Sequence, residues 1–89
     1  MRIICYRTLR EATRKHPDLN QPLDDWYRIA KSATWSCLND VRKTFPHADV
    51  AGNFTVFNIK GNRYRLIVGI DYTKQIIFIK YVLTHAEYD

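Results

Sequence analysis

The spacing of the hydrophobic positions changes near the middle of the chain. In the first half, apolar side chains recur every three to four residues, which is the spacing of one face of a helix. After Asn53, apolar and polar side chains alternate with a period of two, as in strands that bury one face. The pattern predicts N-terminal helices packed on one face of a small antiparallel sheet, an α+β fold. A short strand is expected before the helices, at residues 2–5.

Capping and breaking signals place the first two helices. The stretch TLRE puts Thr8 at capping-box spacing before Glu11, which predicts a helix over residues 9–16 that ends before Pro17. In QPLDDWYRIAKSA, Pro22 suits a first helical turn, and apolar residues follow at helical spacing. This second helix should pack its apolar face on the sheet.

A third, shorter helix is expected between Ser36, as its N-cap, and Pro46, which ends it. Trp26, Tyr27 and Trp35 fall at or near the apolar positions of the helical region. We therefore expect them in the core rather than on a surface that stacks bases. The following HADVAGN segment should be a loop that includes, at most, a short strand.

Two turns set the register of the expected strands. Gly61-Asn62 suits a two-residue hairpin turn, and a second turn is expected around Thr73-Lys74. The resulting pairs are Lys60 with Arg63, Ile59 with Tyr64, Asn58 with Arg65, Phe57 with Leu66, Tyr72 with Gln75, Ile70 with Ile77, Val68 with Ile79 and Leu66 with Tyr81.

Side chains alternate between the two faces of a strand, so these registers predict one apolar face and one basic face. The apolar face should receive the helices and holds Phe57, Ile59, Tyr64, Leu66, Val68, Ile70, Ile77, Ile79, Tyr81 and Leu83. The other, called the open face below, gathers Asn58, Lys60, Arg63, Arg65 and Lys80 with Val56, Ile67, Gly69, Phe78 and Val82. Clustered cations repel one another, which suggests an anion among them; a solvated sheet face is the alternative.

Composition supports one globular domain spanning residues 1–89, with 46% hydrophobic and 26% charged residues. Lys and Arg outnumber Asp and Glu by 14 to 9, and the formal charge of +5 favours nucleic acid or an acidic protein as partner. No stretch is long enough to span a membrane. In the N-terminal stretch MRIICYRTLR, charged residues interrupt the apolar residues before they form a long run. We therefore expect no signal peptide and a cytoplasmic protein.

The cysteines and two of the histidines indicate no metal site or cofactor. Cys5 and Cys37 lack a second Cys or His at ligand spacing, so we expect two buried, reduced thiols. His16 and His47 lie beside prolines in expected loops and should be surface residues.

The tail THAEYD directly follows the last strand, which would bring His85 and Tyr88 within reach of Arg65 and Lys80. His and, beside cations, Tyr are groups that exchange protons near neutral pH. An RNA 2′-hydroxyl that attacks its own phosphate needs a base, an acid and cations for the phosphoryl charge, and it needs no metal. A frayed terminus with surface side chains is the alternative.

Three stretches, RTLREATRKHPDLNQPLDDWYRIAKSATW, VFNIKGNRYRLIVGIDY and IFIKYVLTHAEYD, closely resemble the HigB family of type II toxin–antitoxin systems, within the RelE-like toxins. The resemblance implies a RelE-like fold and a ribosome-dependent endoribonuclease that cuts mRNA during translation. It also implies a HigA-type antitoxin with a helix-turn-helix domain as partner, besides the ribosome and mRNA.

The resemblance also implies site residues. Arg65 falls on the arginine that RelE-like toxins use to stabilise the phosphate charge, Lys60 near their strand lysines, Tyr88 on their C-terminal tyrosine and His85 on a histidine typical of this branch. We expect these four to be catalytic, by 2′-hydroxyl attack that leaves a 2′,3′-cyclic phosphate. Arg63, Lys80 and Asn58 are expected to bind RNA. Two alternatives are a non-catalytic binder, like the toxins of this superfamily that inhibit gyrase, and a chain that has lost activity.

Overall fold

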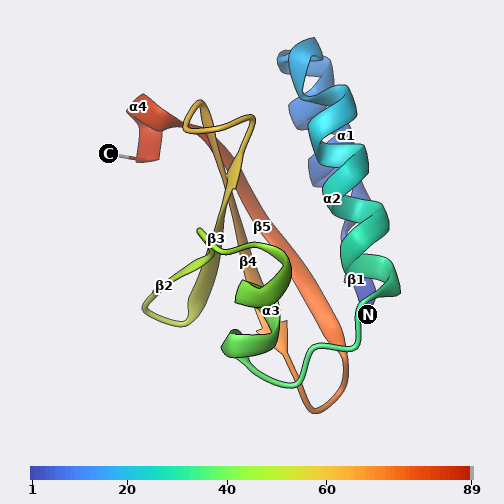
Figure 1. The fold of residues 1–89 in the computed structure, drawn as a ribbon. Coiled ribbons are helices and arrows are strands. Elements are labelled where there is room, and N and C mark those ends of the chain that lie inside the picture. The colour runs from blue at the N-terminus through green and yellow to red at the C-terminus, as the bar shows by residue number, and fades with distance from the viewer. Residues whose placement is uncertain (89) are drawn as a thin grey trace.

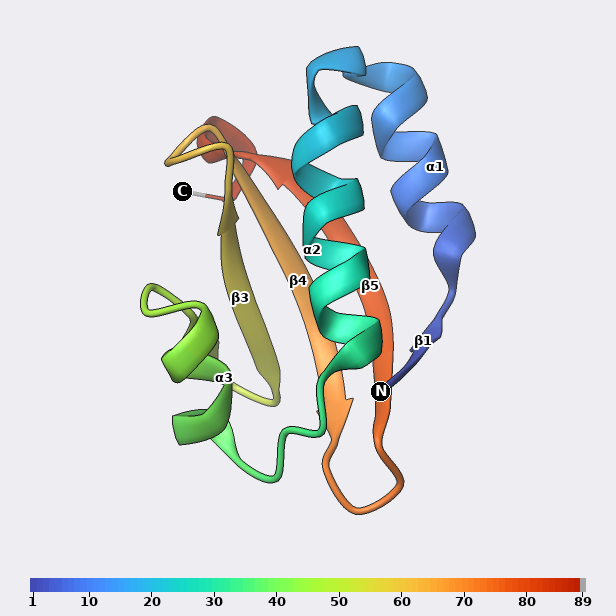
Figure 2. The same ribbon diagram turned by 45° about the vertical axis from the view of Figure 1, so that its right-hand side comes forward.

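The computed structural model describes residues 1–88, and Asp89, the last residue of the THAEYD motif, lies outside the described part. The elements in chain order are β1 (Arg2–Ile4), α1 (Tyr6–Lys15), the 3₁₀ helix η1 (Pro17–Leu19), α2 (Asn20–Ser32), α3 (Leu38–Thr44), β2 (Asp49–Ala51), β3 (Phe54–Ile59), β4 (Tyr64–Asp71), β5 (Ile76–Thr84) and α4 (His85–Tyr88). The sheet has the strand order β1-β5-β4-β3-β2. Helices α1 and α2 run side by side along β5, and α3 lies nearer β3 (Figure 1; Figure 2).

The predicted α+β arrangement is confirmed, with one addition. Strands β2 to β5 pair antiparallel, whereas β1 runs parallel to β5, with Ile3 opposite Ile77. The sheet is therefore mixed. None of the helices within residues 1–88 is long and apolar enough to cross a membrane.

The core lies between the helices and one face of the sheet. Trp26 of α2 is 1% exposed, and its ring meets Phe57 of β3 edge-on at 5.4 Å. Phe45 packs on the same Phe57 ring at 5.2 Å, next to Trp35, which is 5% exposed. Both tryptophans are core residues as predicted, and Tyr27 packs against the core partly buried.

Helix α1 begins earlier than predicted, so the TLRE capping box does not form. No side chain caps α1, and Thr8 lies inside the helix with its N–H directed to the Cys5 carbonyl at 3.3 Å. The earlier start lets the Tyr6 ring pack edge-on against Tyr27, at 4.8 Å between centroids. A contact distant in sequence has therefore overridden a local signal.

Two further predictions are wrong, one for the cap of α3 and one for the burial of the cysteines. Ser36 does not cap α3; its backbone N–H instead donates to the Asp40 carboxylate at 2.9 Å, and Cys37 precedes the helix. Cys37, like Cys5 before α1, stands at a helix boundary rather than inside the core. Both thiols are free and exposed, not buried.

The register of β3 and β4 is as predicted, with Asn58 opposite Arg65. The strands end at Ile59 and resume at Tyr64, so Lys60 and Arg63 belong to the turn and not to the ladder. The Arg63 N–H donates to the Lys60 carbonyl at 3.3 Å. Tyr72 and Gln75 likewise lie in the turn between β4 and β5, so the predicted pair between them is not part of the ladder.

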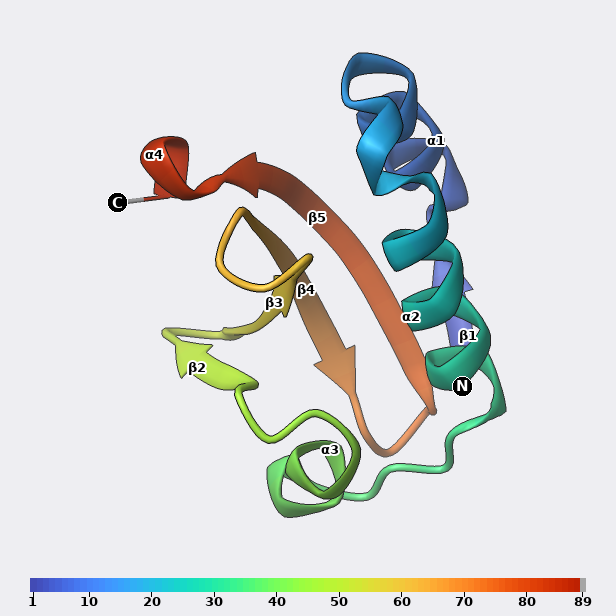
Figure 3. The ribbon, with the colours of Figure 1, turned by 45° about the horizontal axis from the view of Figure 1, so that its top comes forward.

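A β-bulge at Lys80 shifts the second register by one residue. Val68 still faces Ile79 as predicted, but Ile67 then pairs with Tyr81, and Leu66 with Val82 rather than Tyr81. Beyond the bulge the two faces exchange, so Tyr81 and Leu83 lie on the open face and Val82 packs on the core. The predicted faces of these three residues are therefore wrong. Bulges bend their strand, and β5 is visibly curved in Figure 3.

Candidate functional site

Arg65 lies at the centre of the candidate site. It stands half-buried on the open face of β4, with Asn58 and Leu83 as its neighbours across the ladder. Its Nη1 donates to the carbonyls of Asn62 at 3.2 Å and Tyr64 at 3.4 Å. These bonds hold the guanidinium on the side of the sheet that faces away from the core.

The tail of the chain supplies two more groups to this guanidinium. Arg65 Nη2 lies 3.2 Å from His85 Nδ1, and Arg65 Cζ lies 5.7 Å from the centre of the Tyr88 ring, in cation–π geometry. The expected approach of His85 and Tyr88 to Arg65 is therefore confirmed. Within residues 1–88, Arg65 Nε–H and the second Nη2–H have no partner. Such guanidinium donors suit two oxygens of a phosphate.

A capping box explains why the tail returns to Arg65. The Thr84 hydroxyl accepts the Glu87 N–H at 3.2 Å, and the Glu87 carboxylate accepts the Thr84 N–H at 2.8 Å. The His85 N–H then donates to the Arg63 carbonyl at 2.8 Å. Together these bonds fold the last residues into α4 beside the turn between β3 and β4 (Figure 1).

The charge of Glu87 strengthens this cap. Hydrogen bonds from the Thr84 backbone and then from its hydroxyl lower the pKa of the Glu87 carboxyl, assisted by the positive charge of Lys15. The carboxyl is therefore ionised at neutral pH and is a strong acceptor for the Thr84 N–H.

Lys60 does not join the open face. Its φ of 54° takes it out of the strand alternation, and its Nζ lies 3.1 Å from Asp18 Oδ2. Asp18 follows α1 on the helix side, where it also accepts the Tyr64 hydroxyl at 3.0 Å. The hydrogen bonds from Lys60 and then from Tyr64 lower the pKa of Asp18, so its carboxyl is ionised at neutral pH and can pair with the Lys60 ammonium. The expected placement of Lys60 beside Arg65 is therefore wrong.

The three expected RNA-binding residues lie in different settings, and Lys80 is further along the strands from Arg65 than the other two. Lys80 is exposed on the open face, with its ammonium 5.5 Å from the Phe78 ring centre and its stem beside Gly69. Arg63 is exposed in the turn and stays close to the site through its carbonyl. Asn58 is half-buried and donates weakly to Asn62 Oδ1, at 3.5 Å.

Comparison with known proteins decides the family. The family model HigB_toxin, described as the RelE-like toxic component of a toxin–antitoxin system, matches residues 19–89. The chain is 32% identical over 92 residues to the mRNA interferase HigB of Escherichia coli O6:H1 (strain CFT073), in an alignment that covers 100% of this chain and 89% of that protein. It is 27% identical over 95 residues to the mRNA interferase toxin HigB of Escherichia coli K12, covering 100% of this chain and 88% of that one.

The chain belongs to the HigB family. As a HigB-family protein it is the toxic component of a toxin–antitoxin system, which implies an antitoxin as partner. The match begins at Leu19 and so leaves β1 and α1 outside. It includes every candidate site residue on the sheet and on the tail.

Sequence reasoning missed several residues of this HigB site. The spacing of Thr84 and Glu87 is that of a capping box, so the signal was present in the sequence. Tyr81 is 55% exposed on the open face because of the bulge, for which the sequence carries no visible sign. A cavity of about 470 Å³ is lined by His47, Asn58, Gly61 and Asn62. Of these, Asn58 is the cross-strand neighbour of Arg65, and Asn62 accepts a hydrogen bond from it.

His47 is exposed, as predicted, but its position at this cavity was not foreseen. Within residues 1–88, no three His, Cys, Asp or Glu side chains gather as ligands for a metal ion. At the candidate site, Arg65 supplies a cation, and His85 and Tyr88 supply side chains of the kinds that exchange protons.

Proposed function

We propose that this HigB toxin is an mRNA interferase, an endoribonuclease that blocks translation by cutting mRNA. The observation that carries the proposal is the cluster at Arg65: a cation with donors left for a phosphate, in contact with His85 and Tyr88, on a sheet face that the helices leave uncovered. The names of its relatives, which are mRNA interferases, support the same activity.

In the proposed reaction the RNA supplies its own nucleophile. The 2′-oxygen bonds to the adjacent phosphorus, the bond from phosphorus to the 5′-oxygen breaks, and a 2′,3′-cyclic phosphate and a 5′-hydroxyl result. His85 and Tyr88 share the proton transfers, one removing the 2′-proton and the other protonating the leaving oxygen. Arg65 neutralises the charge that builds on the phosphoryl oxygens. The scheme uses no metal ion.

The basic residues outside this cluster would hold the RNA strand. Lys80 on the open face and Arg63 in the turn are exposed and add positive charge on both sides of Arg65. Lys60 would reach the RNA only after leaving Asp18, so we assign the main catalytic work to Arg65, His85 and Tyr88. Asn58, the cross-strand partner of Arg65, would border the bound phosphate.

We further propose that cleavage takes place in the decoding site of the ribosome, in the cytoplasm. Attack by a 2′-hydroxyl requires it to lie in line with the leaving oxygen, and a ribosome that bends the mRNA would fix this geometry. A HigA-type helix-turn-helix antitoxin is the proposed partner, because the family acts within a toxin–antitoxin system.

The test is to induce the chain in cells and map the 5′ ends of mRNA, for the wild type and for Arg65→Ala, Tyr88→Phe and the control Arg14→Ala. Arg14 is exposed on α1 and belongs to neither the sheet nor the tail that carry the candidate site. New 5′ ends should appear with the wild type and Arg14→Ala and be lost with the other two. Unchanged growth arrest in both site variants would remove Arg65 and Tyr88 from the mechanism.

Two other outcomes would change the proposal. Equally fast cleavage of ribosome-free RNA would contradict the role of the ribosome. Intact mRNA during growth arrest, with DNA-damage signalling switched on, would favour the non-catalytic, gyrase-type alternative.

A further inference from the structure

We propose that the cavity beside Arg65 binds one nucleobase of the RNA, next to the scissile phosphate, and so sets the base preference of cleavage. The inference rests on the proposed function and adds to it a specificity site made by His47, Asn58 and Asn62.

Two of the residues that line the cavity are also neighbours of Arg65. The carbonyl of Asn62 accepts the Arg65 Nη1–H at 3.2 Å, and Asn58 is the cross-strand partner of Arg65. Both residues line the cavity on the β3 side of Arg65, whereas His85 and Tyr88 arrive from the end of β5. An RNA strand with its phosphate on Arg65 would therefore place a neighbouring base in the cavity.

The lining suits a base better than a phosphate. None of the four lining side chains carries a fixed charge, so the cavity offers nothing to compete with Arg65 for an anion. Asparagine amides present a donor and an acceptor together, which is the pattern that base edges offer. The exposed imidazole of His47 is a flat ring on which an unstacked base can lie.

The cavity is also accessible. Nothing lies within 4 Å of the position that a Cβ on Gly61 would take, so this wall stays open. The 3.5 Å bond between the two asparagine amides is at the outer limit for a hydrogen bond, and within residues 1–88 their remaining donors and acceptors have no other partner. A base could therefore replace this bond at little cost. The volume of about 470 Å³ is within the usual range of small-ligand sites.

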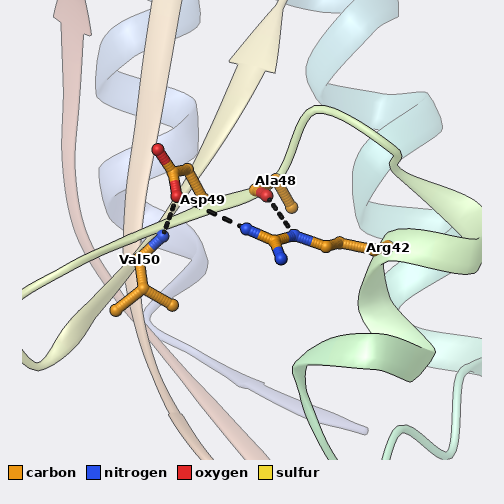
Figure 4. A network of polar contacts seen from close by, with 4 residues as sticks. All are labelled: Arg42, Ala48, Asp49 and Val50. Atoms are coloured by element: carbon orange, nitrogen blue, oxygen red, sulfur yellow. Dashed lines mark hydrogen bonds and ion pairs between the residues drawn. The ribbon is translucent and has the colours of Figure 1, made fainter.

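The segment that carries His47 is held from both sides. Arg42 of α3 donates from Nε to the Ala48 carbonyl at 2.9 Å and from Nη2 to the Asp49 carboxylate at 3.4 Å (Figure 4). The same carboxylate accepts the Val50 N–H at 2.8 Å, and the Ala48 N–H donates to the Phe45 carbonyl at 3.0 Å. This wall of the cavity is therefore built before RNA arrives.

A binding experiment tests the inference without cleavage. The ¹⁵N-labelled protein is titrated with four oligoribonucleotides, each of a single base type and protected by 2′-O-methyl groups. The side-chain amide signals of Asn58 and Asn62 should shift, with affinities that differ between the four bases by about fivefold or more, as for one hydrogen-bonded base contact. Asn62→Ala should remove most of that difference.

If these amide signals stay unmoved, or if all four bases bind equally, the cavity is not a base site. This outcome leaves the proposed nuclease function standing. Base-dependent shifts in a chain that cuts no mRNA would contradict the nuclease function and leave the base site standing.

A second experiment reads specificity in the products. Cleavage positions are mapped for His47→Ala, Asn58→Ala, Asn62→Ala and the control Asn39→Ala, which is exposed on α3. The preference for one base beside the cut should fall by about 5- to 150-fold in the asparagine variants, from the usual 1–3 kcal/mol of such contacts, and persist in the control. An unchanged preference in all three cavity variants, with folding intact by melting temperature, would overturn the inference.

Discussion

The Nη2 of Arg65 lies 3.2 Å from Nδ1 of His85. A guanidinium has only donors, so Nδ1 must be the acceptor, and the imidazole in this contact carries its proton on Nε2. The cation that would bind the phosphate therefore also orients the group that would exchange a proton.

His85→Asn separates these two roles. The Asn carbonyl can replace Nδ1 as acceptor for Arg65, but it cannot exchange a proton near neutral pH. We expect kcat to fall by about 10²- to 10⁴-fold, the usual contribution of a general acid or base, with little change in KM. Single-turnover and steady-state kinetics measure the split. A rise in KM with unchanged kcat would indicate that His85 only holds Arg65.

Loss of the capping box in the tail should lower the rate of cleavage, although none of the proposed catalytic side chains is changed. Glu87→Ala loses the acceptor for the Thr84 N–H, which should lower the population of the docked tail by about fivefold. Cleavage should fall by a similar factor. Glu87→Gln keeps an acceptor at the same position but lacks the charge, so its activity should lie between those of the wild type and Glu87→Ala. Equal losses in both variants would show that an uncharged acceptor contributes nothing to the cap.

The same cap predicts a dependence on acid pH. Because the pKa of Glu87 is lowered below its ordinary value of 4.5, its contribution to docking is fully present above that pH and is lost as pH falls through the lowered value. The Thr84 amide signal in NMR should report this transition, and Glu87→Gln should abolish it. A midpoint at or above 4.5 would show that the cap does not favour the ionised carboxyl.

The bulge predicts that Val82 contributes more to the free energy of unfolding than its neighbour Tyr81. Val82 packs on the core, so Val82→Ser should lower the free energy of unfolding by about 1 kcal/mol. Tyr81 is 55% exposed, so Tyr81→Ser should stay within about 0.5 kcal/mol of the wild type. Urea unfolding compares them. A larger loss for Tyr81→Ser than for Val82→Ser would indicate that the strands pair without the bulge, with Tyr81 on the helix face.

Lys60 should matter less to cleavage than Arg65. Its pair with Asp18 is partly exposed, so Lys60→Met should cost at most about 1 kcal/mol of stability. Cleavage should fall by less than about tenfold, whereas loss of the group that stabilises the transition-state charge in Arg65→Met should cost about 10²-fold or more. Comparable losses in the two variants would show that Lys60 leaves Asp18 to act on RNA.

The sequence alone predicted the structure correctly where local signals determine it. The turn at Gly61 and the alternation on either side place Asn58 opposite Arg65, and this pair puts Arg65 on the open face. The bulge at Lys80 was not predictable, because the Tyr-Val-Leu stretch that follows is apolar in every position. Either face could then take Tyr81 or Val82 without burying a charge.

The two capping-box signals show the same limit. TLRE and THAE share the spacing of a capping box, but only Thr84 and Glu87 form one. The start of α1 is instead set by contacts such as that of Tyr6 with Tyr27, far along the chain. Lys60 was predicted on the wrong face for a related reason. Its positive φ in the turn and its ion pair with the distant Asp18 together direct its side chain to the helix side.

The most direct test of the central claim is the single-turnover rate at which the purified protein cleaves mRNA bound to ribosomes. The comparison is between the wild type, Arg65→Ala and Arg14→Ala, each checked for an unchanged melting temperature. The account predicts a loss of about 10²-fold or more for Arg65→Ala and none for Arg14→Ala. A folded Arg65→Ala protein that cleaves at the wild-type rate would contradict it.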